Sequence, residues 1–355
     1  MWGINRISCI LLLLAFALVV NGRENTPGQE FYYQQLDNRN GLSNSAVNAV
    51  FQDRDQLIWV GTWDGLNMYD GTDFKVFNYS NDNNSESIGN NVVQDIKEDL
   101  RGNVWVSTIG GITRFEKSTG KFFRYFYNQA TKSSIAEKEY ELIIDSRGSV
   151  FCYGKSIGLT AFNEKNSSFE SIGNTAEYQK GIVKIEAGPS GKLWLLRSDG
   201  SLVILEDQNG NLTKIREFDS TKGFSNLFVC NGRVLVQSRK GSLLAVDKNY
   251  SLKPLSDNFP GIKSLEFYRN HFIIAWQGQG IAAFDVQMKP SSLLAKEVRQ
   301  LASTKVTALF SARNDVLWVV TDGNGVIKIH PKLNHFGLVN MVRGISLDRP
   351  VRTFA

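Results

Sequence analysis

Apolar and polar positions alternate along this chain in a unit that repeats seven times between Val47 and Ile329. Each unit has an apolar stretch, a polar turn, a second apolar stretch centred on a large side chain, and a glycine that opens a third stretch. Short apolar runs bounded by turn residues are typical of β-strands. The pattern therefore predicts a repeat architecture built from short strands.

The seven units align on the large residue at the centre of the second stretch, which we call the anchor. Successive anchors lie 38 to 46 residues apart, and a glycine follows each anchor after six or seven residues. The anchors are Trp59, Trp105, Phe151, Trp194, Leu235, Ile273 and Trp318. Such a unit cannot bury its apolar faces alone, whereas units stacked around an axis bury a continuous core. The predicted fold is all-β, a seven-bladed β-propeller built from four-stranded antiparallel blades.

The repeat also predicts the roles of individual positions. The anchors are expected to pack between neighbouring blades, because a large aromatic side chain that recurs at one register is a packing device. Asp53, Asp99 and Asp145 recur between the first and second strands of their units, which marks them as turn formers. Residues 31–36 are expected to form the outermost strand of the last blade and so close the ring.

Composition and charge agree with a single globular body. The apolar fraction is 42%, the charged fraction is 21% and the formal net charge is +5. Because these charges are dispersed, without a block of Lys and Arg, contact with nucleic acid is not expected. Cys152 and Cys230 fall in the third and fifth units, too far apart for a disulfide, so two buried free thiols are expected.

The two ends of the chain lie outside the repeats. Arg6 precedes an apolar run from Ile7 to Val20, which predicts a signal peptide and export, with an uncleaved anchor as the alternative. Residues 341–355 repeat the pattern that precedes Val47, and they are expected to begin a second propeller that is missing from this chain. The predicted domains are a signal peptide over 1–22, a propeller over 31–340 and the start of a second propeller over 341–355.

Two segments carry a resemblance to a known family. The sequence N-G-L-S-N-S-A-V from Asn40 and the pattern V-x-x-I-x-x-D-x-x-G-x-L-W-V-G-T-x-x-G-L-x-x-Y/F-D, seen at 47–70 and 92–116, resemble two-component regulator propeller repeats. The resemblance is strong in the first, second and seventh units and weak in the others. It implies the periplasmic sensor region of a Bacteroidetes hybrid two-component system, in which propellers precede a membrane span and a histidine kinase core. It further implies that this chain is the N-terminal propeller alone, without the kinase.

The same resemblance implies a function and partners. The implied function is recognition of glycan-derived oligosaccharides, coupled to control of polysaccharide utilisation. The implied partners are an oligosaccharide ligand, the second propeller of the full-length sensor, and another copy of that sensor in a homodimer. The implied location is the periplasm, with full-length relatives in the inner membrane, and no cofactor is implied.

Candidate binding residues follow from the order of strands in a propeller blade. Loops that join strands two to three and four to one share one face, and an aromatic ring beside planar polar groups on that face suits a sugar. Trp63 with Asp64, or Trp276 with Gln277, would supply both features. The alternative for each candidate is a solvated turn residue. The candidates are Trp63, Asp64, Arg197, Arg239, Trp276, Gln277, Asp322 and Asn324.

Two further functions are open to a propeller. A glycosidase needs two suitably spaced carboxylates, but the recurrent aspartates are better explained as turn formers, and residues 98–105 only approximate a sialidase aspartate box. The histidines, His271, His330 and His335, lack metal-ligand spacing. We therefore expect no catalytic residue and no metal site. A scaffold that binds another protein through an exposed apolar patch is the remaining alternative.

Overall fold

A computed structural model describes most of the chain after its first 29 residues. The described residues are 30–81, 87–126, 140–155, 157–172, 180–208, 211–276, 279–332, 338–342 and 345–352. The predicted signal peptide over 1–22 lies outside them. In the described part of the chain, no helix is both long enough and apolar enough to cross a membrane.

The repeat units form blades of consecutive antiparallel strands, as predicted. Blade one contains β2 (Val47–Gln52), β3 (Ile58–Thr62), β4 (Gly65–Tyr69) and β5 (Phe74–Phe77). Blade two contains β6 (Val93–Glu98), β7 (Val104–Thr108), β8 (Gly111–Glu116) and β9 (Lys121–Tyr125). Blade three contains β10 (Tyr140–Ile144), β11 (Val150–Gly154), β12 (Gly158–Asn163) and β13 (Ser168–Ser171). Blade four contains β14 (Ile182–Ala187), β15 (Lys192–Arg197), β16 (Leu202–Gln208) and β17 (Asn211–Phe218).

The remaining blades follow the same order. Blade five contains β18 (Phe224–Cys230), β19 (Arg233–Ser238), β20 (Leu243–Val246) and β21 (Leu252–Ser256). Blade six contains β22 (Ile262–Tyr268), β23 (His271–Trp276) and β24 (Gln279–Phe284), followed by the helix α2 (Ala295–Gln300). Blade seven contains β25 (Val306–Ser311), β26 (Leu317–Thr321) and β27 (Val326–Pro331). Short 3₁₀ turns are η1 (Asn38–Asn40), η2 (Pro189–Gly191) and η3 (Ser220–Lys222).

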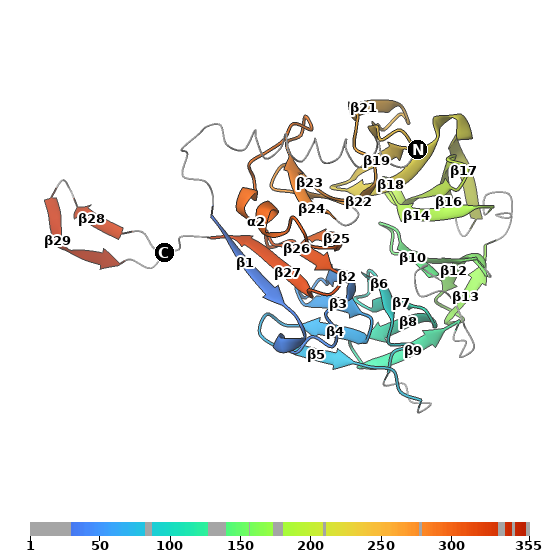
Figure 1. The fold of residues 1–355 in the computed structure, drawn as a ribbon. Coiled ribbons are helices and arrows are strands. Elements are labelled where there is room, and N and C mark those ends of the chain that lie inside the picture. The colour runs from blue at the N-terminus through green and yellow to red at the C-terminus, as the bar shows by residue number, and fades with distance from the viewer. Residues whose placement is uncertain are drawn as a thin grey trace.

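The blades form a closed ring around an axis. The first strand of each blade contacts the first strand of the next, and β25 of blade seven contacts β2 of blade one. These first strands surround the centre of the ring in Figure 1, and the outer strands face solvent. The seven-bladed propeller predicted from the repeat is therefore the fold of this chain.

The ring closes through a strand from the opposite end of the propeller sequence. β1 (Phe31–Leu36) pairs antiparallel with β27, from Phe31 opposite Pro331 to Leu36 opposite Val326. It supplies the fourth strand of blade seven, which confirms the prediction for these residues. Gly325 precedes β27 with a φ of 71°, and a Cβ there would lie 2.1 Å from the carbonyl oxygen of Leu36. Only glycine fits this approach.

The anchors occupy the second strands and pack between blades, as predicted. Trp59 is fully buried and its ring lies 5.6 Å from the ring of Phe115 in blade two. Trp105 is fully buried and its ring lies 4.9 Å from that of Phe162 in blade three. Each indole therefore joins its own blade to the following one.

Aspartates between the first and second strands of a blade accept hydrogen bonds both from the turn and from the anchor. Asp99 Oδ1 accepts backbone hydrogen bonds from Arg101 and Asn103, at 2.9 and 3.0 Å, so the expected turn-forming role is confirmed. Its other oxygen accepts a bond of 2.8 Å from the indole Nε1 of Trp105. Asp53 receives the equivalent bond of 2.9 Å from Trp59. The repeat pattern does not predict this second bond.

Two predictions on the rest of the chain have different outcomes. Cys152 and Cys230 are buried and free, as expected. Residues 338–342 and 345–352 form β28 (Leu338–Val342) and β29 (Ile345–Arg352), which pair with one another in a separate two-stranded sheet. That residues 341–355 begin a second propeller stays a prediction.

Candidate functional site

The candidate residues after the second strands lie at one register position. In five blades, the residue after the second strand donates its backbone N–H to a carbonyl just before or at the start of the first strand. The donors are Trp63, Ile109, Ser198, Arg239 and Asp322. The ring thus brings Trp63, Arg239 and Asp322, from blades one, five and seven, to the same face. We call it the loop face, since it carries the connections between strands two and three.

Trp63 presents a fixed aromatic surface on the loop face. Its side chain is 41% exposed, and its Nε1 donates a hydrogen bond of 3.1 Å to Asn48 Oδ1. Asn48 in turn donates to the carbonyl oxygen of Val93 in blade two, at 2.8 Å. Beside it, Asp64 Oδ1 accepts a bond of 2.9 Å from Asn91. The indole is thereby oriented before any ligand arrives.

The other candidates on the loop face already have partners. Arg239 donates from Nη2 to the carbonyl oxygen of Ser198, at 2.7 Å. Asp322 forms an ion pair with Lys305. Asn324 is exposed and its carbonyl oxygen accepts a bond of 3.0 Å from Gln35 on β1. Their exposed edges could still contact a ligand.

Of the remaining candidates, Arg197 and Trp276 are held by contacts with other side chains. Arg197 pairs with Glu217 on the outermost strand β17, at 3.1 Å, and its side chain is only 14% exposed. Trp276 stacks on Phe259 and packs against Phe284, with ring centroids 6.2 and 6.1 Å apart, so it belongs to the core between blades. Gln277 lies outside the described residues.

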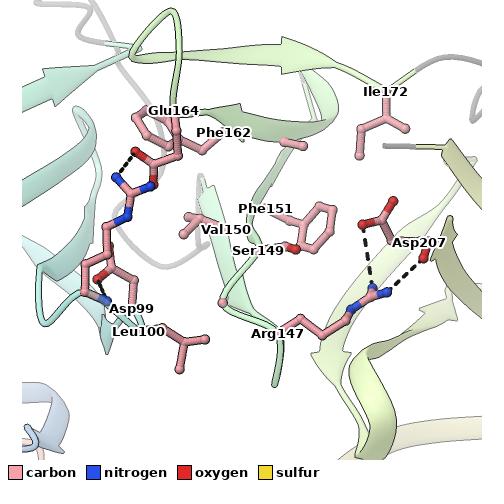
Figure 2. Close-up of a pocket in the computed structure, with 13 residues that line it drawn as sticks. Asp99, Leu100, Arg147, Ser149, Val150, Phe151, Phe162, Glu164, Ile172 and Asp207 are labelled. Carbon is pink, nitrogen blue, oxygen red and sulfur yellow. Dashed lines mark hydrogen bonds and ion pairs between the residues drawn. The ribbon is translucent and has the colours of Figure 1, made fainter. Parts of the chain in front are cut away.

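The opposite face of the ring carries a cavity of about 380 Å³. Strands in a blade alternate in direction, so the turns between strands one and two lie at the opposite edge from the loop face. We call this side the turn face. The cavity lies among blades two, three and four, and none of the seven predicted site residues that the structure describes lines it (Figure 2). It is lined by Asp99, Leu100, Arg101, Arg147, Gly148, Ser149, Val150, Phe151, Ala161, Phe162, Glu164, Ile172 and Asp207.

A change of anchor accompanies this cavity. Blade three has Phe151 where blades one and two have tryptophan, and phenylalanine is smaller and has no ring N–H to donate. Asp145 Oδ2 therefore has no indole partner and accepts instead from Arg147 Nε, at 3.0 Å. Arg147 also donates to the carbonyl oxygens of Asp207 and Gly191, at 2.9 and 3.2 Å. Its guanidinium is thereby fixed between blades three and four.

The opposite wall of the cavity carries a second charged pair. Arg101 donates to Glu164 at 2.8 Å, and these side chains are 65% and 39% exposed. Leu100 beside them is 62% exposed. Figure 2 shows Phe151 between the two walls, with Glu164 on one side and Arg147 with Asp207 on the other. The lining thus combines apolar side chains with arginine–carboxylate pairs on both walls.

A sequence signal for this cavity was present but was interpreted only as a turn. Adjacent units contain D-L-R-G at 99–102 and D-S-R-G at 145–148, and both arginines line the cavity. The second of these motifs lies within the unit whose anchor has changed to phenylalanine. Together, the repeated arginine and the lost tryptophan mark the site.

One carboxyl group on the first strands has a strongly shifted pKa. Glu266 lies on β22, where burial, together with the negative charge of Glu186, raises its pKa to about 7. A hydrogen bond from the backbone N–H of Phe267, at 3.3 Å, acts in the opposite direction. The acid is therefore partly protonated near neutral pH.

Known proteins similar to this chain share a repeat motif or the fold. Residues 41–64 match a family described as two component regulator propeller. No curated protein sequence matches the chain. The extracellular domain of BT3049, described as a hybrid two component system of B. thetaiotaomicron, is 19% identical with a TM-score of 0.65, over 87% of this chain and 43% of that domain.

Two further solved structures extend the comparison. The extracellular domain of BT4673, described as a one component system of B. thetaiotaomicron, is 14% identical with a TM-score of 0.64, over 90% of this chain and 45% of that domain. Virginiamycin B lyase from Staphylococcus aureus is 12% identical with a TM-score of 0.60, over 85% of this chain and 99% of the lyase. At these identities the likeness shows the fold alone. The chain spans less than half the length of the two extracellular domains.

Proposed function

We propose that this chain, which carries a two-component regulator propeller repeat, is a periplasmic sensor propeller of a hybrid two-component system. Its ligand would be an oligosaccharide released from a glycan, and its output would be control of polysaccharide utilisation. The repeat over 41–64 and the likeness in fold to extracellular domains of bacterial signalling systems support this assignment.

The observation that carries the ligand assignment is the fixed indole of Trp63. Sugar rings have apolar C–H faces that stack on aromatic rings, and hydroxyl groups that bond to planar polar side chains. Trp63 is 41% exposed and is oriented by Asn48, so stacking on it would cost little side-chain entropy. Asp64 and Asn91 lie beside it as acceptor and donor.

The recurrent aspartates, the type of residue that a glycosidase uses, have structural roles in this chain. Both carboxylate oxygens of Asp99 accept hydrogen bonds, from the backbone on one side and from Trp105 and Asn103 on the other. Among the described residues, no group of three or more His, Cys, Asp and Glu side chains could hold a metal ion. These observations support binding rather than catalysis by this chain.

Calorimetry with a panel of oligosaccharides tests the proposed function. Trp63→Ala should weaken binding of the active oligosaccharide about fivefold or more, because an aromatic stacking contact is worth about 1 kcal/mol or more, while the melting temperature stays unchanged. Tyr32→Ala is the matched control, since Tyr32 is 52% exposed on the outer edge of blade seven. Equal affinity of the Trp63→Ala variant and the native chain would remove the loop-face site.

Signalling would require that the ligand distinguishes two arrangements of the sensor, because a ligand shifts an equilibrium only by its differential affinity. We expect the second propeller, or a second sensor in a homodimer, to complete the loop-face site. A chain extended through the second propeller should therefore bind the oligosaccharide more tightly than this chain, and Arg239→Glu should weaken both. Calorimetry on the two chains measures this difference. Equal affinities would place the whole site within residues 31–340.

A further inference from the structure

The cavity on the turn face is a second candidate site, separate from Trp63. It has a volume of about 380 Å³, within the range of roughly 300 to 1,000 Å³ that is usual for small-molecule sites. Its lining is mixed, because Leu100, Ala161 and Phe162 supply apolar surface beside the charged side chains. Phe151, Val150 and Ile172 also line it but are almost fully buried. A ligand with at least one flat apolar face would fit this interior.

The charges around the cavity argue against a charged ligand. Arg101 is paired with Glu164, and Arg147 is paired with Asp145 and lies 3.6 Å from an oxygen of Asp207. An anion in the cavity would meet the carboxylates of Glu164 and Asp207, and a cation would meet the two guanidinium groups. Neither sign of charge gains a net attraction, and breaking a partly buried pair leaves one charge unpaired.

The same walls suit a ligand with many hydroxyl groups. Arg147 is fixed by three hydrogen bonds, so it contributes a rigid wall rather than a mobile side chain. Arg101 makes one bond to Glu164 and is 65% exposed, which leaves N–H groups free to donate. Glu164 carries a second oxygen that can accept from a hydroxyl. A donor and an acceptor therefore lie side by side on one wall of the cavity, opposite the fixed guanidinium of Arg147.

From this arrangement, we propose that the turn-face cavity binds a neutral ring-shaped polyol, such as one or two rings of an uncharged saccharide. The apolar face of the ring would contact Phe162 and Leu100, and its hydroxyls would bond to Arg101 and Glu164. The inference stands on the cavity and is independent of the loop-face site.

Saturation-transfer NMR and calorimetry on the full chain, with maltose, cellobiose and xylobiose as neutral probes and glucuronic acid as the anionic one, test the proposal. At least one neutral disaccharide should bind, and glucuronic acid should bind more weakly. Glu164→Gln should weaken the neutral probe about tenfold and strengthen glucuronic acid, because Arg101 loses its counter-charge. The control is Glu170→Gln, since Glu170 bonds to Asn163 and Asn166 outside the cavity.

A second variant changes the volume instead of the charge. Phe151→Trp restores the anchor of blades one and two, and its indole would fill space in the cavity and offer an N–H to Asp145. Binding of the neutral disaccharide should be lost while the melting temperature is kept or raised. If Phe151→Trp unfolds the chain, the change of charge preference in Glu164→Gln remains the deciding measurement.

Three results would overturn the proposal: no binding of any neutral disaccharide, tighter binding of glucuronic acid by the native chain, or neutral binding that neither variant changes. The Trp63→Ala variant separates the two sites. Binding that is lost in Trp63→Ala but kept in Glu164→Gln and Phe151→Trp belongs to the loop face, and the reverse pattern belongs to the cavity.

Discussion

At the scale of single residues, an aspartate six positions before a tryptophan anchor accepts a hydrogen bond from its indole. Blades one and two have it, whereas blades four and seven have Gly188 and Ala312 at this position. The indole nitrogens of Trp194 and Trp318 are buried there without a hydrogen-bond partner among the described residues. A buried N–H without an acceptor costs about 1 to 3 kcal/mol. Two blades therefore retain the apolar anchor without its polar bond.

Restoring this acceptor in blade seven should stabilise the chain. Ala312 already makes the turn, because its N–H donates to the carbonyl oxygen of Val316 at 2.8 Å, as that of Asp53 does to Leu57. Ala312→Asp should place a carboxylate beside Trp318 Nε1 and raise the free energy of unfolding by about 1 kcal/mol. Urea denaturation measures this change.

The same substitution in blade four should have the opposite sign. A Cβ added at Gly188 would lie 2.2 Å from Trp194 Nε1, so the side chain would collide with its intended partner. Gly188→Asp should therefore lower the free energy of unfolding. The explanation is that the space beside each indole decides whether an added aspartate stabilises the chain. If Ala312→Asp and Gly188→Asp shift the urea midpoint in the same direction, this explanation is wrong.

The sequence predicted the anchors because their spacing and size are visible in the residues themselves. It did not predict the indole bonds, since a hydrophobic pattern carries no information on acceptors. The cavity was missed for another reason. It depends on the volume lost when Phe151 replaces a tryptophan, and on Arg147 reaching the carbonyl oxygen of Asp207 in the next blade.

At the scale of elements, the first strands are joined by side chains as well as by packing. In six blades the pairing of the first and second strands shifts by one residue near the start of the first strand. Polar side chains at or beside several of these bulges bond to the backbone of the next blade. Such bonds run from Asn48 to Val93, from Lys184 to Leu227, from Asn226 to Ile262 and from Thr307 to Val47.

In blade six, the repeat pattern does not predict the outermost element correctly. The fourth strand expected there is replaced, among the described residues, by a bridge between Phe284 and Pro290 and by α2. Leu294 and Leu301 flank α2 and pack into the core shared with blade seven. Either a fourth strand or a helix can cover the outer side of the blade. The apolar repeat alone therefore does not distinguish between these two elements.

Removal of β1 should open the last blade. A chain that lacks residues up to 38 would expose the hydrogen-bonding edge of β27 and the apolar surface that covers Phe31, which is 7% exposed. We expect this shortened chain to aggregate, because unpaired strand edges pair with other chains. Light scattering after size-exclusion chromatography measures the mass. A chain that lacks only residues 1–29 is the control, and a monomeric chain without β1 would contradict the prediction.

At the scale of the whole molecule, the ring brings charges from separate blades close together. Glu186 in blade four and Glu266 in blade six are 80 residues apart in sequence, yet the first raises the pKa of the second. The count of seven units predicted the ring, and the order of strands predicted which loops share a face. Interactions across the axis could not be predicted, because they depend on which side chains the first strands turn inward.

Stability should depend on pH through Glu266. Its pKa is about 7 in the folded chain against 4.5 in the unfolded chain, so the folded chain binds more protons between these values. Stability from this group is present below pH 4.5 and is lost as the pH rises through 7. Glu266→Gln should match the native chain at pH 4 and exceed its unfolding free energy at pH 8 by up to about 3 kcal/mol. Melting temperatures at the two pH values test this, and an equal difference at both would refute it.

The pairing of β1 with β27 also determines how the ring would respond to mechanical force. The chain enters this pair at Glu30 and leaves it at Lys332, and these two residues are bonded to each other, backbone to backbone at 2.7 Å and side chain to side chain at 2.6 Å. Tension between the two chain ends would therefore break the hydrogen bonds between β1 and β27 one after another, beginning with those between Glu30 and Lys332. A force along the strands would instead load all the hydrogen bonds of this pair at once. The strand pair that seals the propeller is thus the one that a pull on both ends opens first.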